Sequence, residues 1–391
     1  MQYRQFGKLD WQVSALGFGA MRLPTKDGEI DEAESTKMLH YAIDHGVNYL
    51  DTAYTYHNGA SETFLGRALK GGYREKVRLA TKMPSWEIKT AADFDKYLDI
   101  QLERLQLDTV DFYLLHGLNK ERWAKLHGLG VIKWAERAIA AGRFRYLGFS
   151  FHDDYATFEQ IVNEYDWTMC QIQYNYVDVE NQAGTKGLKY AASKGLAVVI
   201  MEPMLGGKLV APPSPVQSIW ESAATKRTPV GWALQWLWNQ PEVSVVLSGM
   251  SAMEQVKENV ALASASKVDL AVNELALYDQ VRAGYKALTA IPCTKCGYCM
   301  PCPQGVNIPG NFADYNDGLM YAKPDAARGH YSWCKFAYEV QHIFDHDVRA
   351  AQCIQCQECE TKCPQNIPIS KWMPVIHQVL GENAPYVTAL E

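Results

Sequence analysis

Eight of the ten cysteines in this 391-residue chain lie in two short runs toward its C-terminal end. The runs read Cys293-x2-Cys296-x2-Cys299-x2-Cys302-Pro303 and Cys353-x2-Cys356-x2-Cys359-x3-Cys363-Pro364. Thiolates are soft ligands that hold zinc or iron–sulfur clusters, and in oxidising compartments cysteines pair as disulfides instead. The spacing therefore indicates either a metal centre or a disulfide framework.

Three cysteines two residues apart and then a Cys-Pro, twice over, favour iron–sulfur clusters. A disulfide framework is typical of small secreted chains, and no apolar signal segment starts this sequence. Zinc usually takes its four ligands from two separated pairs of cysteines. Three thiolates with this spacing wrap one face of a cluster, and a remote fourth thiolate completes it. We therefore expect two 4Fe–4S clusters, with zinc as the alternative.

The second run has the spacing with which bacterial ferredoxins hold 4Fe–4S clusters, and the first is one residue shorter before its Cys-Pro. In two-cluster ferredoxins the fourth cysteine of each run ligates the other cluster. The resemblance therefore implies crossed ligation. One cluster would be held by Cys293, Cys296, Cys299 and Cys363, and the other by Cys302, Cys353, Cys356 and Cys359. Both runs end in Cys-Pro-Gln-x-x-x-Ile, at 302–308 and 363–369, which supports a ferredoxin-like duplication.

The two remaining cysteines lie outside these runs. Cys170 falls in an apolar, strand-like segment, and we expect it to be a core residue. Cys334 is either a core residue or a spare ligand, and we favour the core.

Composition bounds the class of protein. With 48% hydrophobic and 21% charged residues, the chain can build a large core, and its length suits two domains. The net charge of −6 and the absence of a Lys/Arg block argue against a nucleic-acid partner. No apolar run is long enough to span a membrane. We expect a cytoplasmic protein without a membrane or nucleic-acid partner.

Eight short apolar segments alternate with amphipathic stretches over residues 1–285. They lie at 15–19, 47–51, 77–82, 110–116, 144–150, 169–174, 197–202 and 243–248. Eight strands with helical crossovers predict an α/β fold of the (β/α)8 TIM barrel type. A doubly wound sheet is the alternative, but no G-x-G-x-x-G follows the first strand. We expect this barrel over 1–285, followed by a small, mainly helical, ferredoxin-like two-cluster domain over 286–391.

Polar side chains close six consecutive strands of the expected barrel. They are Asp51, Lys82, His116, Ser150, Gln171 and Glu202. The C-terminal ends of the strands are where TIM barrels carry their chemistry. We therefore expect a site at that end of the barrel.

These strand ends resemble the aldo/keto reductase family. The resemblance rests on Asp51-Thr-Ala-Tyr-Thr-Tyr56 with Glu62 following, on Thr81-Lys82 and on Leu115-His116-Gly117. It implies that Asp51, Tyr56, Lys82 and His116 are catalytic, with NAD(P)H as cofactor and a small carbonyl or alcohol as substrate. The cysteine-rich remainder is similar to the ferredoxin-like tail of an iron–sulfur branch of that family.

The chemistry of the four side chains fits this implication. A hydride that reaches a carbonyl carbon leaves negative charge on oxygen, which needs a proton donor. Tyrosine has an ordinary pKa of about 10. We expect the ammonium of Lys82 to lower the pKa of Tyr56, with Asp51 as its counter-ion. His116 would then hydrogen bond to the substrate carbonyl.

The same resemblance implies a cofactor site along the later strands. Its residues would be Ser150, Gln171, Met201, Pro203, Gly206, Lys208, Ser248, Gly249, Glu258 and Asn259. Gly249 and Gln255 stand where the family pattern has basic residues for the NADPH 2′-phosphate. Met201 stands where the family pattern has an aromatic residue that stacks on the nicotinamide. After the fifth strand the sequence reads Ser150-Phe151-His152 in place of the expected Ser-Asn pair. We therefore expect no strong preference for NADPH, and a flavin remains possible as cofactor.

Two functions follow, from different classes. The first is a nicotinamide-dependent oxidoreductase whose two clusters carry electrons or serve structure. The second is a flavin- or ferredoxin-linked redox enzyme, or an electron-transfer module, that uses the barrel without nicotinamide hydride chemistry. Nicotinamide moves two electrons together and a cubane cluster moves one, so direct coupling needs a flavin or a radical-tolerant substrate. A ferredoxin or another redox protein is a candidate partner. Trp11, Trp86, His57 and Trp220 hint at an apolar substrate pocket.

Overall fold

The computed structural model describes residues 1–340 and 343–390, and the chain divides into two compact units. The first unit contains residues 1–206 and 227–271, and the second contains residues 207–226 and 272 onward. Helix α11 (Val272–Ala287) belongs to the second unit because it packs on α8 (Ser214–Glu221), where Trp220 lies 5.0 Å from Tyr278 between ring centroids. Packing therefore divides the chain differently from 1–285 and 286–391, and that sequence boundary stays a prediction.

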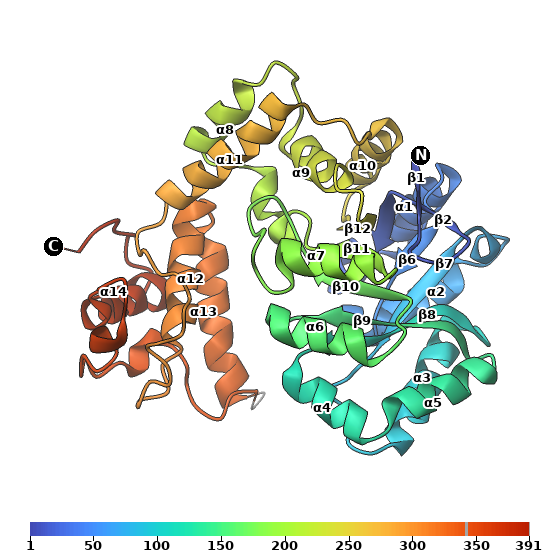
Figure 1. Ribbon diagram of the computed structural model, residues 1–391, viewed down its shortest axis with the longest axis horizontal. Helices are drawn as coiled ribbons and strands as arrows, with labels where there is room; N and C mark the ends of the chain where they lie inside the picture. Colours follow the sequence, from blue (N-terminus) through green and yellow to red (C-terminus); the bar gives the residue numbers. More distant parts are fainter. Residues whose placement is uncertain (341–342, 391) are drawn as a thin grey trace. The chain divides into compact units, whose positions relative to one another are not determined.

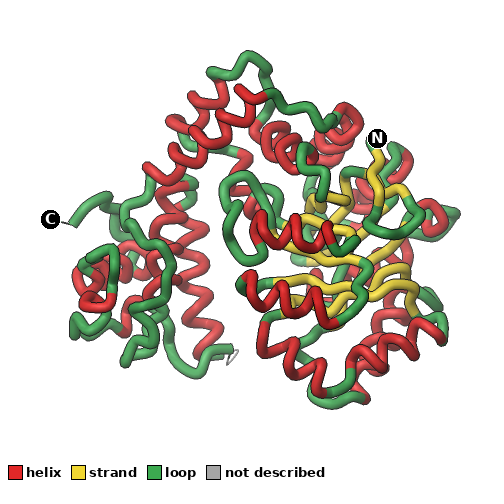
Figure 2. Tube along the Cα trace, viewed as in Figure 1, coloured by secondary structure: helices red, strands yellow, loops and turns green. Residues whose placement is uncertain are grey.

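The first unit is built on a closed barrel of eight parallel strands (Figures 1 and 2). The strands are β3 (Leu16–Gly19), β6 (Tyr49–Asp51), β7 (Arg78–Met83), β8 (Val110–Leu118), β9 (Phe144–Phe151), β10 (Met169–Gln173), β11 (Ala197–Met201) and β12 (Val243–Gly249). Each pairs with the next in sequence, and β12 closes the barrel on β3 with Gly249 opposite Gly19. All eight segments expected from the sequence form these strands, and the TIM barrel is confirmed.

Helices connect the strands and cover the outside of the barrel (Figure 1). They are α1 (Glu32–Asp44), α2 (Ala60–Ala68), α3 (Ala92–Leu105), α4 (Lys120–Gly128), α5 (Val131–Ala140), α6 (Tyr155–Glu164), α7 (Gly184–Ser193), α9 (Pro229–Trp238) and α10 (Met253–Ala265). Helix α1 shows why they form where they do. The Asp31 carboxylate caps it by accepting from the Glu34 N–H at 3.1 Å, and Met38 and Leu39 are buried. Gly46, with φ of 97°, follows its end.

The N-terminal end of the barrel is closed by the hairpin of β1 (Tyr3–Gln5) and β2 (Gln12–Ser14). Phe6, between these strands, packs among buried side chains such as Tyr49 and Phe112, from the first halves of β6 and β8. Trp11 joins this cluster, 6.0 Å from Phe112 between ring centroids. The hairpin therefore closes the end of the barrel opposite to the strand ends that carry Asp51 and Lys82. A second small hairpin pairs β4 (Thr25–Lys26) with β5 (Glu29–Ile30).

The second unit is mainly helical, as expected, and Figure 2 draws it with helices and loops. Besides α8 and α11 it contains α12 (Ile308–Met320), α13 (Pro324–Glu339), α14 (Ile369–Gly381) and the short 3-10 turns η3 (Leu205–Val210, from Gly207 on), η4 (Ala350–Gln352) and η5 (Glu360–Lys362). Its core includes Phe312, Tyr315, Tyr331 and Trp372. Across residues 1–340 and 343–390, no helix combines the length and apolar character needed to cross a membrane.

Cys170 and Cys334 are both buried, as expected of core residues. Cys170 lies in β10 and is fully buried. Burial raises the pKa of the Cys334 thiol to about 11. Neither thiol lines the cavities that the other eight cysteines form.

Candidate active site and cluster sites

Asp51, Lys82 and Tyr56 meet inside the C-terminal end of the barrel. Lys82, on β7, is 1% exposed and uses all three ammonium hydrogens. It donates to Asp51 Oδ1 at 2.5 Å, to the Thr52 carbonyl oxygen at 2.8 Å and to the Tyr56 phenol oxygen at 3.2 Å. Tyr56 stands on the loop that leaves β6, directly after the strand that ends at Asp51. The structure therefore assembles three of the four side chains expected to be catalytic.

Burial decides the protonation state of the phenol. It raises the pKa of Tyr56 above its ordinary value, although the nearby Lys82 acts to lower it. Burial also acts to lower the pKa of Lys82, but Asp51 and Tyr56 together raise it above its ordinary value. The expected net lowering of the Tyr56 pKa is wrong because desolvation outweighs the ammonium. Tyr56 therefore holds its proton at neutral pH.

His116, on β8, completes the group. Its ring centroid lies 6.1 Å from that of Tyr56 and 5.0 Å from that of Trp86. Burial, with the nearby charges of Lys82, His152 and Arg122, holds the pKa of His116 well below its ordinary value. Its Nδ1 is buried and makes no hydrogen bond within residues 1–340 and 343–390. A neutral imidazole beside the phenol can donate one ring N–H to a substrate oxygen.

A buried network around Glu62, whose partners sequence reasoning missed, holds Lys82 and the loop of Tyr56 in place. Glu62, fully buried on α2, accepts from Gln101 at 2.6 Å and from Arg104 at 3.2 Å. Gln101 also donates to the Lys82 carbonyl oxygen at 3.0 Å, and Arg104 donates to that of Tyr54 at 3.0 Å. Helix α3 thereby fixes both β7 and the loop that carries Tyr56. The available signal was Gln101, a polar residue on the buried face of an amphipathic helix.

Five of the residues expected to bind cofactor make hydrogen bonds within the protein itself. Gln171 donates from its amide to Asp51 Oδ2. Ser150 Oγ accepts from the Gly117 N–H at 2.8 Å, and Ser248 Oγ accepts from Asn259 at 3.0 Å. These contacts place their side chains at the ends of β9, β10 and β12. Glu258 is turned to another partner, because it accepts from the Thr228 hydroxyl at 2.8 Å.

The end of β11 and the loop after it carry four more of the expected cofactor residues, and Gly249 ends β12. Met201 ends the strand, Pro203 is buried, and Leu205 and Gly206 both have positive φ. Lys208 pairs with the Asp317 carboxylate of α12 within the second unit, and its ammonium lies 5.2 Å from the centre of the Tyr321 ring. That cation is therefore already neutralised.

Arg22 is a cation that sequence reasoning missed. It follows β3, yet it lies against two glycines of other loops. A Cβ on Gly206 would lie 3.4 Å from Arg22 Nη2, and one on Gly249 would lie 3.2 Å from Arg22 Cβ. The two glycines thus leave room for the arginine, which pairs with no carboxylate in the described chain. Sequence separation hid this arrangement, because closure of β12 on β3 creates it.

The four residues that hinted at a substrate pocket have different places. Trp86 does lie at the candidate site, beside His116. His57, on the same loop as Tyr56, accepts from the Leu23 N–H at 3.2 Å. The hint is wrong for Trp11, which lies at the closed end of the barrel. Trp220 packs on Tyr278 in the second unit.

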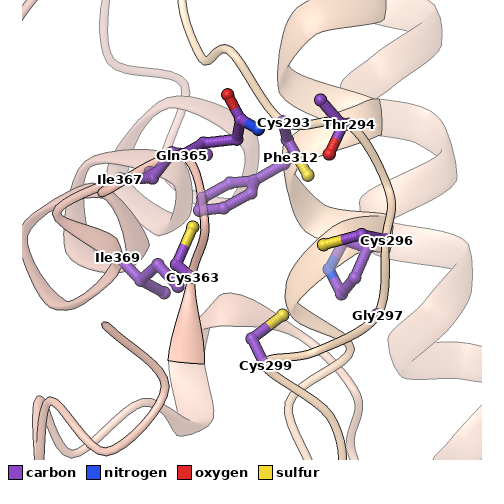
Figure 3. A pocket seen from close by; sticks show the side chains of 11 residues that line it. Cys293, Thr294, Cys296, Gly297, Cys299, Phe312, Cys363, Gln365, Ile367 and Ile369 are labelled. Atoms are coloured by element: carbon purple, nitrogen blue, oxygen red, sulfur yellow. The ribbon is translucent and has the colours of Figure 1, made fainter. Parts of the chain in front are cut away.

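The eight clustered cysteines surround two cavities in the second unit, and none forms a disulfide. The first cluster site is lined by Cys293, Cys296, Cys299 and Cys363. The second cluster site is lined by Cys302, Cys353, Cys356 and Cys359. Figure 3 shows the sulfur atoms of the first site turned toward a common space. Each site combines three thiols of one run with the fourth of the other, the grouping that crossed ligation requires.

The donor sets fit a cluster better than a single ion. In residues 1–340 and 343–390, no three His, Cys, Asp or Glu side chains converge closely enough to hold one metal ion. Apart from the cysteines, apolar side chains such as Phe312, Ile367 and Ile369 line the first site. Four thiols around one cavity with an apolar wall are the ligand set of a 4Fe–4S cluster.

Comparison with known proteins identifies both parts of the chain. Residues 15–280 match the model of the aldo/keto reductase family, and residues 292–367 match that of the 4Fe-4S dicluster domain. The chain belongs to the aldo/keto reductase family and carries a C-terminal 4Fe-4S domain. It is an oxidoreductase.

Relatives cover the barrel. L-galactose dehydrogenase from Arabidopsis thaliana is 29% identical over 282 residues, which are 67% of this chain and 88% of the relative. Aldo-keto reductase yakc [NADP(+)] from Schizosaccharomyces pombe is 28% identical over 50% of this chain and 58% of its own length. The structure of aldo-keto reductase AKR11C1 from Bacillus halodurans (holo form) superposes with a TM-score of 0.61 at 27% identity, and covers 72% of this chain and 96% of that one.

Proposed function

We propose that this enzyme reduces a small-molecule carbonyl, or oxidises the matching alcohol, with a nicotinamide cofactor bound at the C-terminal end of the barrel. The observation that carries the proposal is the buried contact of Lys82 with both Asp51 and the Tyr56 phenol. A solvated or vestigial strand end would not keep a lysine 1% exposed with every hydrogen bonded. The cost of burying that charge is expected where the charge serves chemistry.

The side chains have separate tasks in the reduction. Bound nicotinamide would supply the hydride to the carbonyl carbon. Tyr56 gives its phenolic proton to the carbonyl oxygen, so that one hydride and one proton complete the alcohol. Lys82 stabilises the phenolate that Tyr56 becomes, and Asp51 keeps Lys82 charged and in position. His116, neutral at pH 7, donates a hydrogen bond that orients the carbonyl.

The cofactor phosphates are proposed to lie against Arg22. Gly206 and Gly249 lie against Arg22, and this places the arginine beside the loops after β11 and β12, where the cofactor is expected. The fission-yeast relative is named for NADP(+), which supports a nicotinamide cofactor. Lys257 is the cation left near the expected 2′-phosphate position, and its side chain is exposed. We therefore still expect little discrimination between NADPH and NADH.

The second unit is proposed to hold two 4Fe–4S clusters by crossed ligation. Ile369 lines both cluster sites, so a single side chain borders both cavities. Two clusters separated by one side chain are suited to exchange electrons, so the clusters are proposed to carry electrons as well as to stabilise the fold. Coupling of these single electrons to hydride transfer requires a flavin or a radical-tolerant substrate. A ferredoxin or other redox protein is the proposed external partner.

An absorbance spectrum of anaerobically purified protein, with iron and sulfide analysis, tests this assignment. It reports clusters and flavin in one measurement. Steady-state oxidation of NADPH and NADH with a panel of carbonyls then tests the barrel. Turnover that depends on Tyr56 supports the reductase. Cluster reduction without any nicotinamide turnover would instead support an electron-transfer module.

A further inference from the structure

The two cysteine runs repeat one another in conformation as well as in sequence. Three positions of each run adopt the same positive-φ backbone, at matched distances from the cysteines. The pairs are Lys295 (56°) with Gln355 (59°), Gly297 (76°) with Gln357 (65°), and Gly305 (73°) with Asn366 (50°). The two cysteine runs therefore form loops of the same conformation. The two cluster sites can be compared at equivalent positions of these loops.

Backbone hydrogen bonds to sulfur are equal in the two sites. The Lys295 N–H donates to Cys293 Sγ at 3.4 Å, and the Gln355 N–H donates to Cys353 Sγ at 3.4 Å. Such bonds, net charge and solvent exposure set the reduction potential of a cluster. Because these backbone donors match, they do not separate the two sites.

Charged side chains do separate them. Along the sequence, two lysines adjoin ligands of the first cluster site, Lys295 before Cys296 and Lys362 before Cys363. Two glutamates, Glu358 and Glu360, adjoin Cys359, a ligand of the second cluster site. The second cysteine run contains both the two glutamates and Lys362. The positive and negative charges are divided between the two sites only because Cys363, next to Lys362, lines the first site.

Glu360 is held in place at the second cluster site. Its Oε1 accepts from the Ser370 N–H at 2.7 Å and from the Ser370 hydroxyl at 2.6 Å, at the start of α14. Ser370 itself lines the second cavity. The matching positions in the first run are Met300 and Pro309. Proline has no N–H to cap, and methionine has no carboxylate, so this charge has no counterpart in the first run.

We propose that Glu360 and Lys295 give the two clusters different reduction potentials, so that electrons pass from the second cluster site to the first. A fixed negative charge opposes the arrival of an electron, and a positive charge favours it. In each transfer the second cluster is oxidised by one electron and the first is reduced by one. Ile369, which borders both cavities, marks the short route between them. This inference rests on the proposed two-cluster content of the second unit.

An anaerobic redox titration of the full chain, followed by electron paramagnetic resonance, tests it. In wild type we expect two potentials that favour the first site at least tenfold, which is about 59 mV for one electron. Glu360→Gln keeps an oxygen for Ser370 and removes the charge, so it should raise the lower potential alone. Lys295→Gln should lower the higher potential alone. The matched control is Glu382→Gln, which follows the C-terminal end of α14, about 18 Å along the helix from Ser370.

The outcomes are distinct. Equal potentials in wild type, the reverse order, or equal shifts of both potentials in Glu360→Gln would overturn the inference. A shift in Glu382→Gln as large as that in Glu360→Gln would do the same, because it would show that position is irrelevant. If Glu360→Gln incorporates little iron, the potentials of Lys295→Gln decide instead. An unchanged higher potential in that variant would overturn the inference. Iron analysis of wild type separates this result from the proposed function, because four irons per chain would refute the second cluster itself.

Discussion

Lys82 and Asp51 form an ion pair inside the barrel, with side-chain exposures of 1% and 4%. The second carboxylate oxygen of Asp51 is not free either, because Gln171 donates to it. The ion pair therefore joins the neighbouring strands β6 and β7, and the hydrogen bond from Gln171 connects it to β10 on the opposite side of the barrel. A pair buried in this way is sensitive to the loss of either partner.

Asp51→Asn should damage both folding and catalysis. The substitution leaves the Lys82 ammonium buried without its counter-ion, which costs about 3–5 kcal/mol in the free energy of unfolding. It also removes the group that keeps Lys82 charged beside Tyr56. Denaturant unfolding and turnover of the same preparation measure the two effects. A loss of stability below about 1 kcal/mol with full turnover would contradict this account of the pair.

Tyr56→Phe should remove nearly all carbonyl reduction and leave the iron content unchanged. The phenol is the proposed proton donor, and such groups contribute roughly 10²- to 10⁴-fold to rate. Turnover per chain and iron analysis are the measurements. Tyr54→Phe, two residues away on the same loop, is the matched control and should retain activity. Wild-type turnover in Tyr56→Phe would refute the role assigned to the phenol.

Reduction and oxidation should depend on pH in opposite ways. Because burial raises the pKa of Tyr56, the protonated acid persists through neutral pH, and reduction should fall only above pH about 10. Oxidation requires the phenolate and should still be rising at that pH. The lowered pKa of His116 predicts no step near its ordinary value of about 6.5. Profiles of kcat/KM against pH in both directions test this. A reduction rate that already declines as the pH is raised toward 8 would contradict the prediction.

Arg22→Gln should weaken NADPH and NADH binding about equally. A lost hydrogen bond to a charged phosphate is worth about 1.5–3 kcal/mol, which is roughly tenfold or more in Kd. Cofactor fluorescence titration of each variant provides the affinities. Arg67→Gln, whose arginine pairs with Glu32 on the surface, serves as control. Wild-type affinity in Arg22→Gln, or a hundredfold preference for NADPH in wild type, would contradict the proposed phosphate contacts.

Cys363→Ser should disturb the cluster held by the other run. Its thiol lines the cavity of Cys293, Cys296 and Cys299, so that signal should change while the second remains. Wild-type protein should contain about eight irons and eight acid-labile sulfides per chain. Electron paramagnetic resonance after anaerobic reduction follows each cluster. Stoichiometric zinc, or loss of the signal from the site of Cys353, would refute crossed ligation.

Much of the fold could be predicted because its signals are local. Each barrel strand is a short apolar run, and Asp51, Lys82 and His116 follow from the rule that parallel strands end at one face. The spacing of the cysteines indicated their chemistry for the same reason, because thiols three residues apart in a loop can bind the same cluster. The crossed grouping came from resemblance to ferredoxins, and the structure places the eight sulfur atoms accordingly.

The sign of the Tyr56 pKa shift, the partner of Lys208 and the place of Arg22 were decided by the tertiary structure. The first depends on how much water the barrel excludes, which no pair of neighbouring residues reveals. The second depends on a helix more than a hundred residues away, where Asp317 neutralises the lysine. The third depends on closure of β12 against β3, which brings Arg22 to Gly249. Desolvation and long-range contact are properties of the folded arrangement, whereas periodicity and spacing are carried by the chain itself.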